Sequence, residues 1–299
     1  LTDVTGVQTC ALPIFLKMNK MRKIGIYVAV LLVLFLSCKN KENGNTRRIR
    51  LVSYNIEFFA EAGALEIARM LHTYCPDLIA LQEVPEKEGF QSARDVQKAL
   101  DQIEDSLQTG IKWHCYTGKI GSGNDERKYK SILSRTPLTD TLEIDLMPPG
   151  GRRGASAVRG VTEIFGIMVS AYSLHTPAAP HYKQTLVNSA ALTNDSSEVV
   201  IVMGDFNEHL YGKGDSALRS SGFVPTWDEL GIDVTQNRTY DARGIEPNAG
   251  VIDHIFLKGK NIRVTDGGII ELEKALSDHC PVWAELAIDR GKGEKRGTR

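Results

Sequence analysis

The sequence predicts an α/β fold in which two largely antiparallel β-sheets are flanked by helices. Its composition is that of a folded globular protein, with 42% hydrophobic and 24% charged residues. Eight short runs are rich in Val, Ile and Leu and have the length of β-strands. Only three stretches show helical spacing of apolar residues, which is too few for a doubly wound parallel sheet with one helix after each strand.

The predicted elements follow from these patterns in chain order. Strands are predicted at 49–55, 77–82, 130–134, 155–163, 167–173, 199–203, 251–257 and 281–288. The segment Ala62–Tyr74 carries apolar residues three and four positions apart, as does Gln91–Leu107, so both are expected to be helices that cover a sheet. A third helix is predicted at His181–Leu192 on the same grounds.

The N-terminal residues are not expected to belong to this fold. The stretch Val4–Ile14 resembles a translated reading frame of a sequencing adapter, so we expect 1–17 to be non-native. In 18–37, basic residues precede the thirteen apolar residues Ile24–Leu36. A helix that spans a bilayer needs about 20 apolar residues, so this shorter run predicts a signal peptide.

Cys38 ends a segment, Phe35-Leu36-Ser37-Cys38, that resembles a bacterial lipobox. We therefore expect Cys38 to carry a lipid, the alternatives being an uncleaved anchor or an ordinary buried cysteine. The polar segment 38–48 would be a tether, 49–289 a single domain, and 290–299 a basic tail. The protein is then expected to be exported, attached to a bacterial membrane through the lipid, and monomeric.

Polar side chains occur where several predicted apolar strands begin or end. These residues are Asn55, Glu83, His175, Asp205, Asn207, Asp253, Asp278 and His279. A carboxylate or imidazole that emerges from a buried strand is costly unless it is paired, protonated or bound to a metal. The repeated pattern therefore predicts one shared site.

The chemistry of this set favours some classes of site over others. Hard oxygen ligands with few imidazoles suit Mg²⁺ or Mn²⁺ better than zinc, and Glu83 and Asn55 could hold such an ion. A histidine beside a carboxylate is typical of an oriented general base. The sequence has no C-x-x-C, H-E-x-x-H, G-x-S-x-G, P-loop or G-x-G-x-x-G motif. These absences argue against thiolate metal sites, zincin proteases, serine hydrolases, nucleotide-driven enzymes and dinucleotide binders.

Six motifs in order carry a family resemblance: SYNIE, LQEV, LHTPAAP, GDFN, IDHIF and SDHCPV. Between residues 53 and 282 they resemble the endonuclease/exonuclease/phosphatase superfamily, and most closely its deoxyribonuclease I branch. The resemblance implies a four-layer α/β/β/α sandwich of two mainly antiparallel sheets. It also implies hydrolysis of phosphate esters with a divalent metal, Mg²⁺ or Mn²⁺.

The resemblance also implies roles for residues that match the family's motifs. Glu83 matches the principal metal-binding glutamate, Asn55 the asparagine that supports the ion, and Asp278 an acid near the metal. The catalytic matches are His279 as general base, Asp253 as its orienting acid, Asp205 and Asn207 as the pair that positions the nucleophile, and His175 as a phosphate or leaving-group contact.

The substrate is less well defined by the sequence than the reaction is. The deoxyribonuclease branch has a second active-site glutamate, for which this chain offers Glu126 out of register or Lys128 in register. Arg152 and Arg153 could contact phosphates or could lie in a solvated hairpin. The formal net charge of −1 argues against tight binding to nucleic acid.

These observations predict an exported, lipid-anchored hydrolase that cleaves DNA without sequence preference. A phospholipid or small-molecule phosphoesterase of the same superfamily is the alternative, because membrane attachment would suit it. A third possibility is a surface binding module with an inactive site, although all six motifs carry their polar residues.

Overall fold

The computed structural model describes residues 46–120, 127–146, 155–176, 192, 194–245 and 250–289. The predicted leader, the lipid site at Cys38, the tether up to residue 45, the basic tail, Arg152, Arg153 and nearly all of the helix predicted at His181–Leu192 lie outside these residues. Within the described part, no helix is both long and apolar enough to cross a bilayer.

The first sheet has six strands in the order β11-β12-β1-β2-β4-β3. Their bounds are β1 Thr46–Asn55, β2 Leu78–Val84, β3 His114–Thr117, β4 Tyr129–Ser134, β11 Ile262–Ile269 and β12 Val282–Asp289. β1 and β2 at the centre run parallel, and every other neighbouring pair is antiparallel.

The second sheet repeats this plan in the order β5-β6-β7-β8-β10-β9. Its strands are β5 Thr139–Asp145, β6 Ser156–Ile164, β7 Ile167–His175, β8 Val199–Asp205, β9 Val224–Pro225 and β10 Asp253–Gly259. Here β7 and β8 form the central parallel pair, and the remaining pairs are antiparallel.

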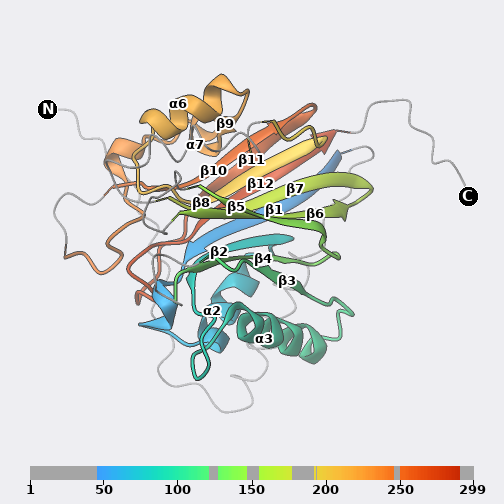
Figure 1. Cartoon of the computed structure of the whole chain (residues 1–299), viewed down its shortest axis with the longest axis vertical. Coiled ribbons are helices and arrows are strands. Elements are labelled where there is room, and N and C mark those ends of the chain that lie inside the picture. Colours follow the sequence, from blue (N-terminus) through green and yellow to red (C-terminus); the bar gives the residue numbers. More distant parts are fainter. Residues whose placement is uncertain are drawn as a thin grey trace, which may run out of the picture. The chain divides into compact units, whose positions relative to one another are not determined.

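In the described part of the chain, four α-helices lie outside the sheets, and Figure 1 shows where they lie. Helices α2 (Ala64–Thr73) and α3 (Ala93–Ser106) lie together beside the first sheet, and α6 (Lys213–Ser220) and α7 (Thr226–Leu230) lie on the opposite side of the sandwich. Helix α3 begins with a capping box in which Ser92 and Asp95 satisfy each other's backbone N–H groups. The short turns η1 (Glu57–Phe59) and η2 (Val234–Gln236) complete the described elements.

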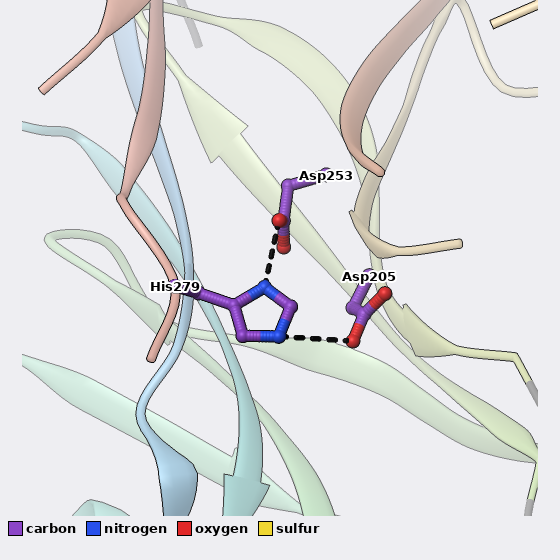
Figure 2. A group of neighbouring side chains, drawn as sticks. All are labelled: Asp205, Asp253 and His279. Atoms are coloured by element: carbon purple, nitrogen blue, oxygen red, sulfur yellow. Dashed lines mark hydrogen bonds and ion pairs between the residues drawn. The ribbon is translucent and has the colours of Figure 1, made fainter. Parts of the chain in front are cut away.

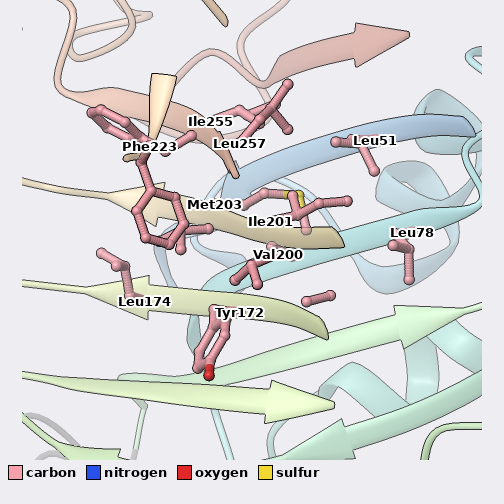
Figure 3. Close-up of a cluster of buried hydrophobic side chains, with 14 of the residues drawn as sticks. Leu51, Leu78, Tyr172, Leu174, Val200, Ile201, Met203, Phe223, Ile255 and Leu257 are labelled. Atoms are coloured by element: carbon pink, nitrogen blue, oxygen red, sulfur yellow. The ribbon is translucent and has the colours of Figure 1, made fainter. Parts of the chain in front are cut away.

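Alternating side chains of β1 separate two hydrophobic cores. Ile49 and Leu51 point between the sheets, where they join residues of β7, β8 and β10 in one buried cluster (Figure 3). Val52 and Tyr54 point the other way and pack with α2 and α3. Because side chains of a strand alternate between its two faces, one sheet can serve both cores.

The predicted sandwich of two sheets flanked by helices is confirmed, with the refinement that each sheet contains one parallel pair. The predicted helices over residues 62–74 and 91–107 correspond to α2 and α3, and all eight predicted strands are present. Six further elements were not predicted from the sequence: β3, β5, β9, β11, α6 and α7.

Candidate active site

The topology brings the polar strand ends to one edge of the sandwich. In the parallel pair β1/β2, Asn55 is the register partner of Gln82, and in β7/β8, His175 is the partner of Asp205. Parallel neighbours end at the same edge, so their terminal side chains lie close together. Asp253 begins β10 as the register partner of Asp205, and its strand therefore starts where β8 ends.

Two backbone features make these strand ends possible. Gly204 has φ +156°, and a Cβ atom there would lie 2.0 Å from the carbonyl oxygen of Leu174, so the close approach of β7 and β8 requires glycine. Glu83 has φ +52° where the register of β2 against β4 shifts between Leu81 and Val84. Such a bulge changes the direction of a side chain relative to its strand, and here the Glu83 carboxylate lies 3.9 Å from His175 Nε2.

His279 lies between two aspartates (Figure 2). Its Nδ1 is 2.8 Å from Asp253 Oδ2, and its Nε2 is 3.7 Å from Asp205 Oδ2. All three side chains are at least 95% buried. The Tyr240 ring packs against the imidazole with the ring centroids 5.3 Å apart. The arrangement fixes the imidazole and leaves Nε2 facing the centre of the site.

Asn55 connects the two sheets at this point. Its Nδ2 donates to Asp205 Oδ2 at 3.0 Å and lies 3.5 Å from His279 Nε2. Its backbone carbonyl accepts a hydrogen bond from the Ser277 hydroxyl at 2.7 Å, and the same hydroxyl accepts from the His279 N–H. The asparagine and the histidine are thereby held in a common network.

Burial and charge shift the pKa values of the central groups in different directions. Burial lowers the pKa of His279, but the carboxylates of Asp253 and Asp205 outweigh it and raise the value to about 10. Burial raises the pKa of Asp205, and the charge of His279 opposes that rise. The His279 side chain is therefore an imidazolium that lies between Asp253 and Asp205, and its ion pair with Asp253 stabilises this charged form.

His175 occupies the opposite wall of the site. Its Nε2 is 3.1 Å from Asn207 Nδ2 and 3.4 Å from Asp205 Oδ2. Burial lowers its pKa well below the usual value, and the positive charges of Lys130 and Lys128 lower it further. A neutral imidazole can donate a hydrogen bond to a phosphate oxygen, but it is a poor source of a full proton at neutral pH.

The predicted metal residues have basic partners. Glu83 Oε1 accepts a hydrogen bond from Lys128 Nζ at 2.5 Å. Lys128 is in register with the second glutamate of the deoxyribonuclease branch, and it therefore contacts the glutamate predicted to be the principal metal ligand. Asp278 Oδ1 is 3.9 Å from His279 Nε2, and its Oδ2 is 3.6 Å from Arg243 Nη2.

Arg243 and Tyr240 were not predicted from the sequence. Both reach the site from the loop before β10, where no apolar run or motif marks their position. Arg243 also contacts Glu57, which lies just beyond the end of β1.

The donor chemistry of the site fits a divalent cation. The Oδ1 atom of Asp253 is buried and has no hydrogen-bond partner among the described residues. A buried carboxylate oxygen without a partner is energetically costly unless a cation lies beside it. In the described part of the chain, Asp205, Asp253 and His279 form the group whose potential ligand atoms all lie within 4.8 Å of one another. Hard oxygens predominate, as Mg²⁺ and Mn²⁺ prefer.

All eight strand-end residues predicted from the sequence therefore border one site. His279, Asp253, Asp205 and Asn55 form its centre, His175 and Asn207 one wall, and Glu83 and Asp278 contact the two histidines from its rim. The division of these residues into metal ligands and catalytic groups remains a prediction.

His254 is adjacent to Asp253 but belongs to the structure rather than to the site. Its Nδ1 accepts from the Trp227 indole at 3.0 Å, and its Nε2 is 2.8 Å from the carbonyl oxygen of Glu208. Burial lowers its pKa. Both ring nitrogens are thus used to hold α7 and the loop after β8.

A two-sheet sandwich with a buried His–Asp pair, a facing carboxylate and amide, and acids for a cation defines a metal-dependent phosphoric ester hydrolase. The chain belongs to the Endonuclease/Exonuclease/phosphatase family, whose model matches residues 52–279. Enzymes of this family depend on divalent metals. No curated protein matches the chain.

Solved structures show the same fold at low identity. An endonuclease/exonuclease/phosphatase from Beutenbergia cavernae is 18% identical with a TM-score of 0.63, over 81% of this chain and 72% of that one. A mannosyl-6-phosphatase from Bacteroides thetaiotaomicron is 18% identical with a TM-score of 0.57, over 80% and 99%. TDP2 from D. rerio, complexed with a single-strand DNA product, is 17% identical with a TM-score of 0.56, over 80% and 98%.

Proposed function

We propose that the protein hydrolyses phosphodiesters of DNA without sequence preference, using a water molecule activated by His279 and Asp253. The observation that carries this proposal is the buried contact of His279 Nδ1 with Asp253 at 2.8 Å, which leaves Nε2 facing Asp205 and Asn55. No nucleophilic serine or cysteine is needed, because water attacks the phosphorus directly.

The chain's own residues divide the work of such a reaction. Once deprotonated, His279 Nε2 accepts the proton of the attacking water, and Asp253 stabilises the imidazolium that forms. Asn55 Nδ2, which donates to Asp205 Oδ2, is placed to donate to the phosphate oxygens on which negative charge grows. Asn207 Nδ2 donates to the Thr176 carbonyl oxygen and lies 3.1 Å from His175 Nε2, so this amide positions the His175 imidazole. His175, held neutral by burial, lies at the opposite wall of the site, where it would contact the same oxygens.

Glu83, Asn55 and Asp278 would hold the divalent cation. The ion would supply positive charge to the phosphate and to the developing transition state, and it would make loss of the His279 proton easier. We keep Mg²⁺ and Mn²⁺ as the candidates, since both suit oxygen ligands.

A small-molecule or phospholipid phosphoesterase is the second candidate. Lys128 stands where the deoxyribonuclease branch has its second glutamate, and its ammonium contacts Glu83 at 2.5 Å. The added positive charge favours a terminal phosphate, which is more negative than a diester. The similarity to a mannosyl-6-phosphatase supports the same class of substrate.

We also propose that the protein acts outside the cytoplasm, attached to a membrane by a lipid on Cys38. Labelling of the chain with palmitate in a bacterial host tests this directly. Labelling that is lost in Cys38→Ala supports the lipid site, and labelling that persists in this variant refutes it.

Three assays with Mg²⁺ rank the candidate substrates. Nicking of a supercoiled plasmid is expected, together with slower release of phosphate from mannose 6-phosphate and of phosphocholine from sphingomyelin. Phosphate release without nicking would favour the second candidate. Absence of all three activities would favour a binding module with an inactive site.

A further inference from the structure

A left-handed turn directly follows Asn55 and separates two phenylalanines. Glu57, Phe58 and Phe59 have φ values of +44°, +45° and +62°, a run that L-residues rarely adopt. Phe59 packs against the core beneath α2 and α3. Phe58 is half-buried and is not part of either described core. The turn thus packs one partly buried ring against this core and holds the other ring away from both cores.

Active-site residues hold this turn in place. The backbone N–H of Glu57 donates to Asn55 Oδ1 at 3.1 Å, and the Glu57 carboxylate accepts from the backbone N–H of Asp278 at 3.1 Å. Arg243 contacts the same carboxylate at 3.2 Å. The position of Phe58 is therefore fixed relative to two residues of the predicted metal site.

A guanidinium covers the Phe58 ring. The central carbon of Arg127 lies 4.5 Å from the ring centroid, a distance typical of a cation–π contact. The next residue, Lys128, contacts Glu83 at 2.5 Å. Arg127 is therefore the chain neighbour of the residue that contacts Glu83.

We propose that Phe58 and Arg127 form a stacking site for a flat heteroaromatic ring, such as a nucleobase, attached to the phosphate that is cleaved. Aromatic rings and guanidinium planes both stack on bases without regard to their identity, which suits a hydrolase with no sequence preference. The charge of Arg127 also favours the anionic backbone of a nucleotide. This inference rests on the proposed phosphoesterase site and assigns it a nucleotide rather than a sugar phosphate.

The chain contains a matched control for this pair. Phe165 also has a positive φ, +54°, and Arg47 lies 5.6 Å from its ring centroid. Phe165 lies in the turn before β7, and His175 ends this strand of nine residues. At 3.3 Å per residue, the length of the strand separates the two residues by about 30 Å. Its replacement removes the same kind of contact far from the site.

Calorimetric binding of two phosphates tests the proposal. With Ca²⁺ in place of Mg²⁺ to limit turnover, the wild-type chain is expected to bind thymidine 5′-phosphate more tightly than 2-deoxyribose 5-phosphate. Stacking of one base predicts a ratio of about 5- to 150-fold. Phe58→Asn should reduce the ratio toward one, because Asn tolerates a left-handed φ but has no ring. Phe165→Asn should leave the ratio unchanged.

Two further variants keep the test decisive. Arg127→Met, which does not alter the strained turn, should also lower the ratio, and Phe58→Tyr should preserve it. In the two Phe58 variants, unchanged affinity for 2-deoxyribose 5-phosphate shows that the phosphate site is intact. In Arg127→Met, the ratio of the two affinities cancels the loss of charge that both ligands share. A wild-type ratio near one, or a ratio that Arg127→Met and Phe58→Asn leave unchanged, would overturn the proposal.

The binding test of the stacking site can fail or succeed independently of the nicking test of the proposed function. Plasmid nicking with no effect of Phe58 on the binding ratio would leave the nuclease proposal standing and remove the stacking site. A base preference that depends on Phe58, in a chain that does not nick DNA, would support the stacking site and remove the nuclease proposal.

Discussion

The two sides of the active site differ in how their acids are neutralised. Asp253 and Asp205 face His279, and all three side chains are at least 95% buried. Glu83 and Asp278 are instead paired with Lys128 and Arg243, whose side chains are 29% and 35% exposed. A buried pair cannot be broken without leaving a charge in the interior, whereas a partly exposed basic side chain can move at little cost.

This difference suggests a division of labour. The His279 side is fixed before any substrate arrives, as the proposed general base requires. On the Glu83 side, we propose that a divalent cation can replace the basic partners of the acids. Substitutions on the two sides should therefore differ in their effects on catalysis, metal binding and stability.

Replacing the imidazole should have the largest effect. His279→Asn is expected to lower kcat by at least about a hundredfold, because general base catalysis contributes about 10²–10⁴. Steady-state hydrolysis with Mg²⁺ measures this. His254→Asn is the matched control, since that buried histidine contacts Trp227 and a backbone carbonyl, and it should lower the melting temperature rather than kcat. Unchanged turnover in His279→Asn would remove this residue from the base role.

Removing the lysine beside Glu83 should strengthen metal binding. Lys128→Met is expected to lower the Kd for Mn²⁺ several-fold, because the ammonium at 2.5 Å no longer competes for the carboxylate. Titration of the metal-free protein by calorimetry gives this value. Lys112→Met, which removes an ion pair with Asp105 on α3, provides the comparison and should leave Kd unchanged. Equal affinities in wild type and Lys128→Met would contradict an exchangeable partner.

The stability of the metal-free protein should decline in alkaline solution. The pKa of His279 is raised on folding to about 10, so its stabilising contribution is complete below the unfolded value of about 6.5 and is lost as pH rises from about 7 to 10. Urea unfolding at several pH values measures this slope. His279→Asn should flatten it, and an unchanged slope in that variant would show that other groups cause the decline.

The smallest effect is expected at the exposed arginine. Arg243→Met should lower the free energy of unfolding by less than about 1 kcal/mol, because partly exposed ion pairs contribute little. Chemical denaturation checks the value. A loss of several kcal/mol would mean that this side of the site is as rigid as the His279 side.

The sequence was sufficient to predict the sandwich and the eight strand-end residues, because both depend on local signals. Central strands are apolar on both faces, and a polar residue at the end of such a strand stands out, as Asp205 does after Val199–Met203. Edge strands do not show this contrast. β5 exposes most of its residues to solvent, and β11 contains two consecutive glycines, so neither strand forms an apolar run.

Contacts between distant segments were beyond prediction from the sequence. Nothing around Arg243 indicates that it meets Glu57 and Asp278, since this contact depends on how a loop folds over the sheet edge. Lys128 was noted as a departure from the family pattern, but its pairing with Glu83 required the register shift in β2. The left-handed turn at Phe58 likewise has no glycine to mark it.

A crystal of the protein soaked with Mn²⁺ would show where the metal binds, because the anomalous signal locates the ion independently of activity. We expect a manganese peak at the shared edge of the two sheets, bound by the Glu83 carboxylate in place of Lys128 and close to the His279–Asp253 pair. A fully occupied manganese site elsewhere on the molecule, with Glu83 still paired to Lys128, would contradict this expectation.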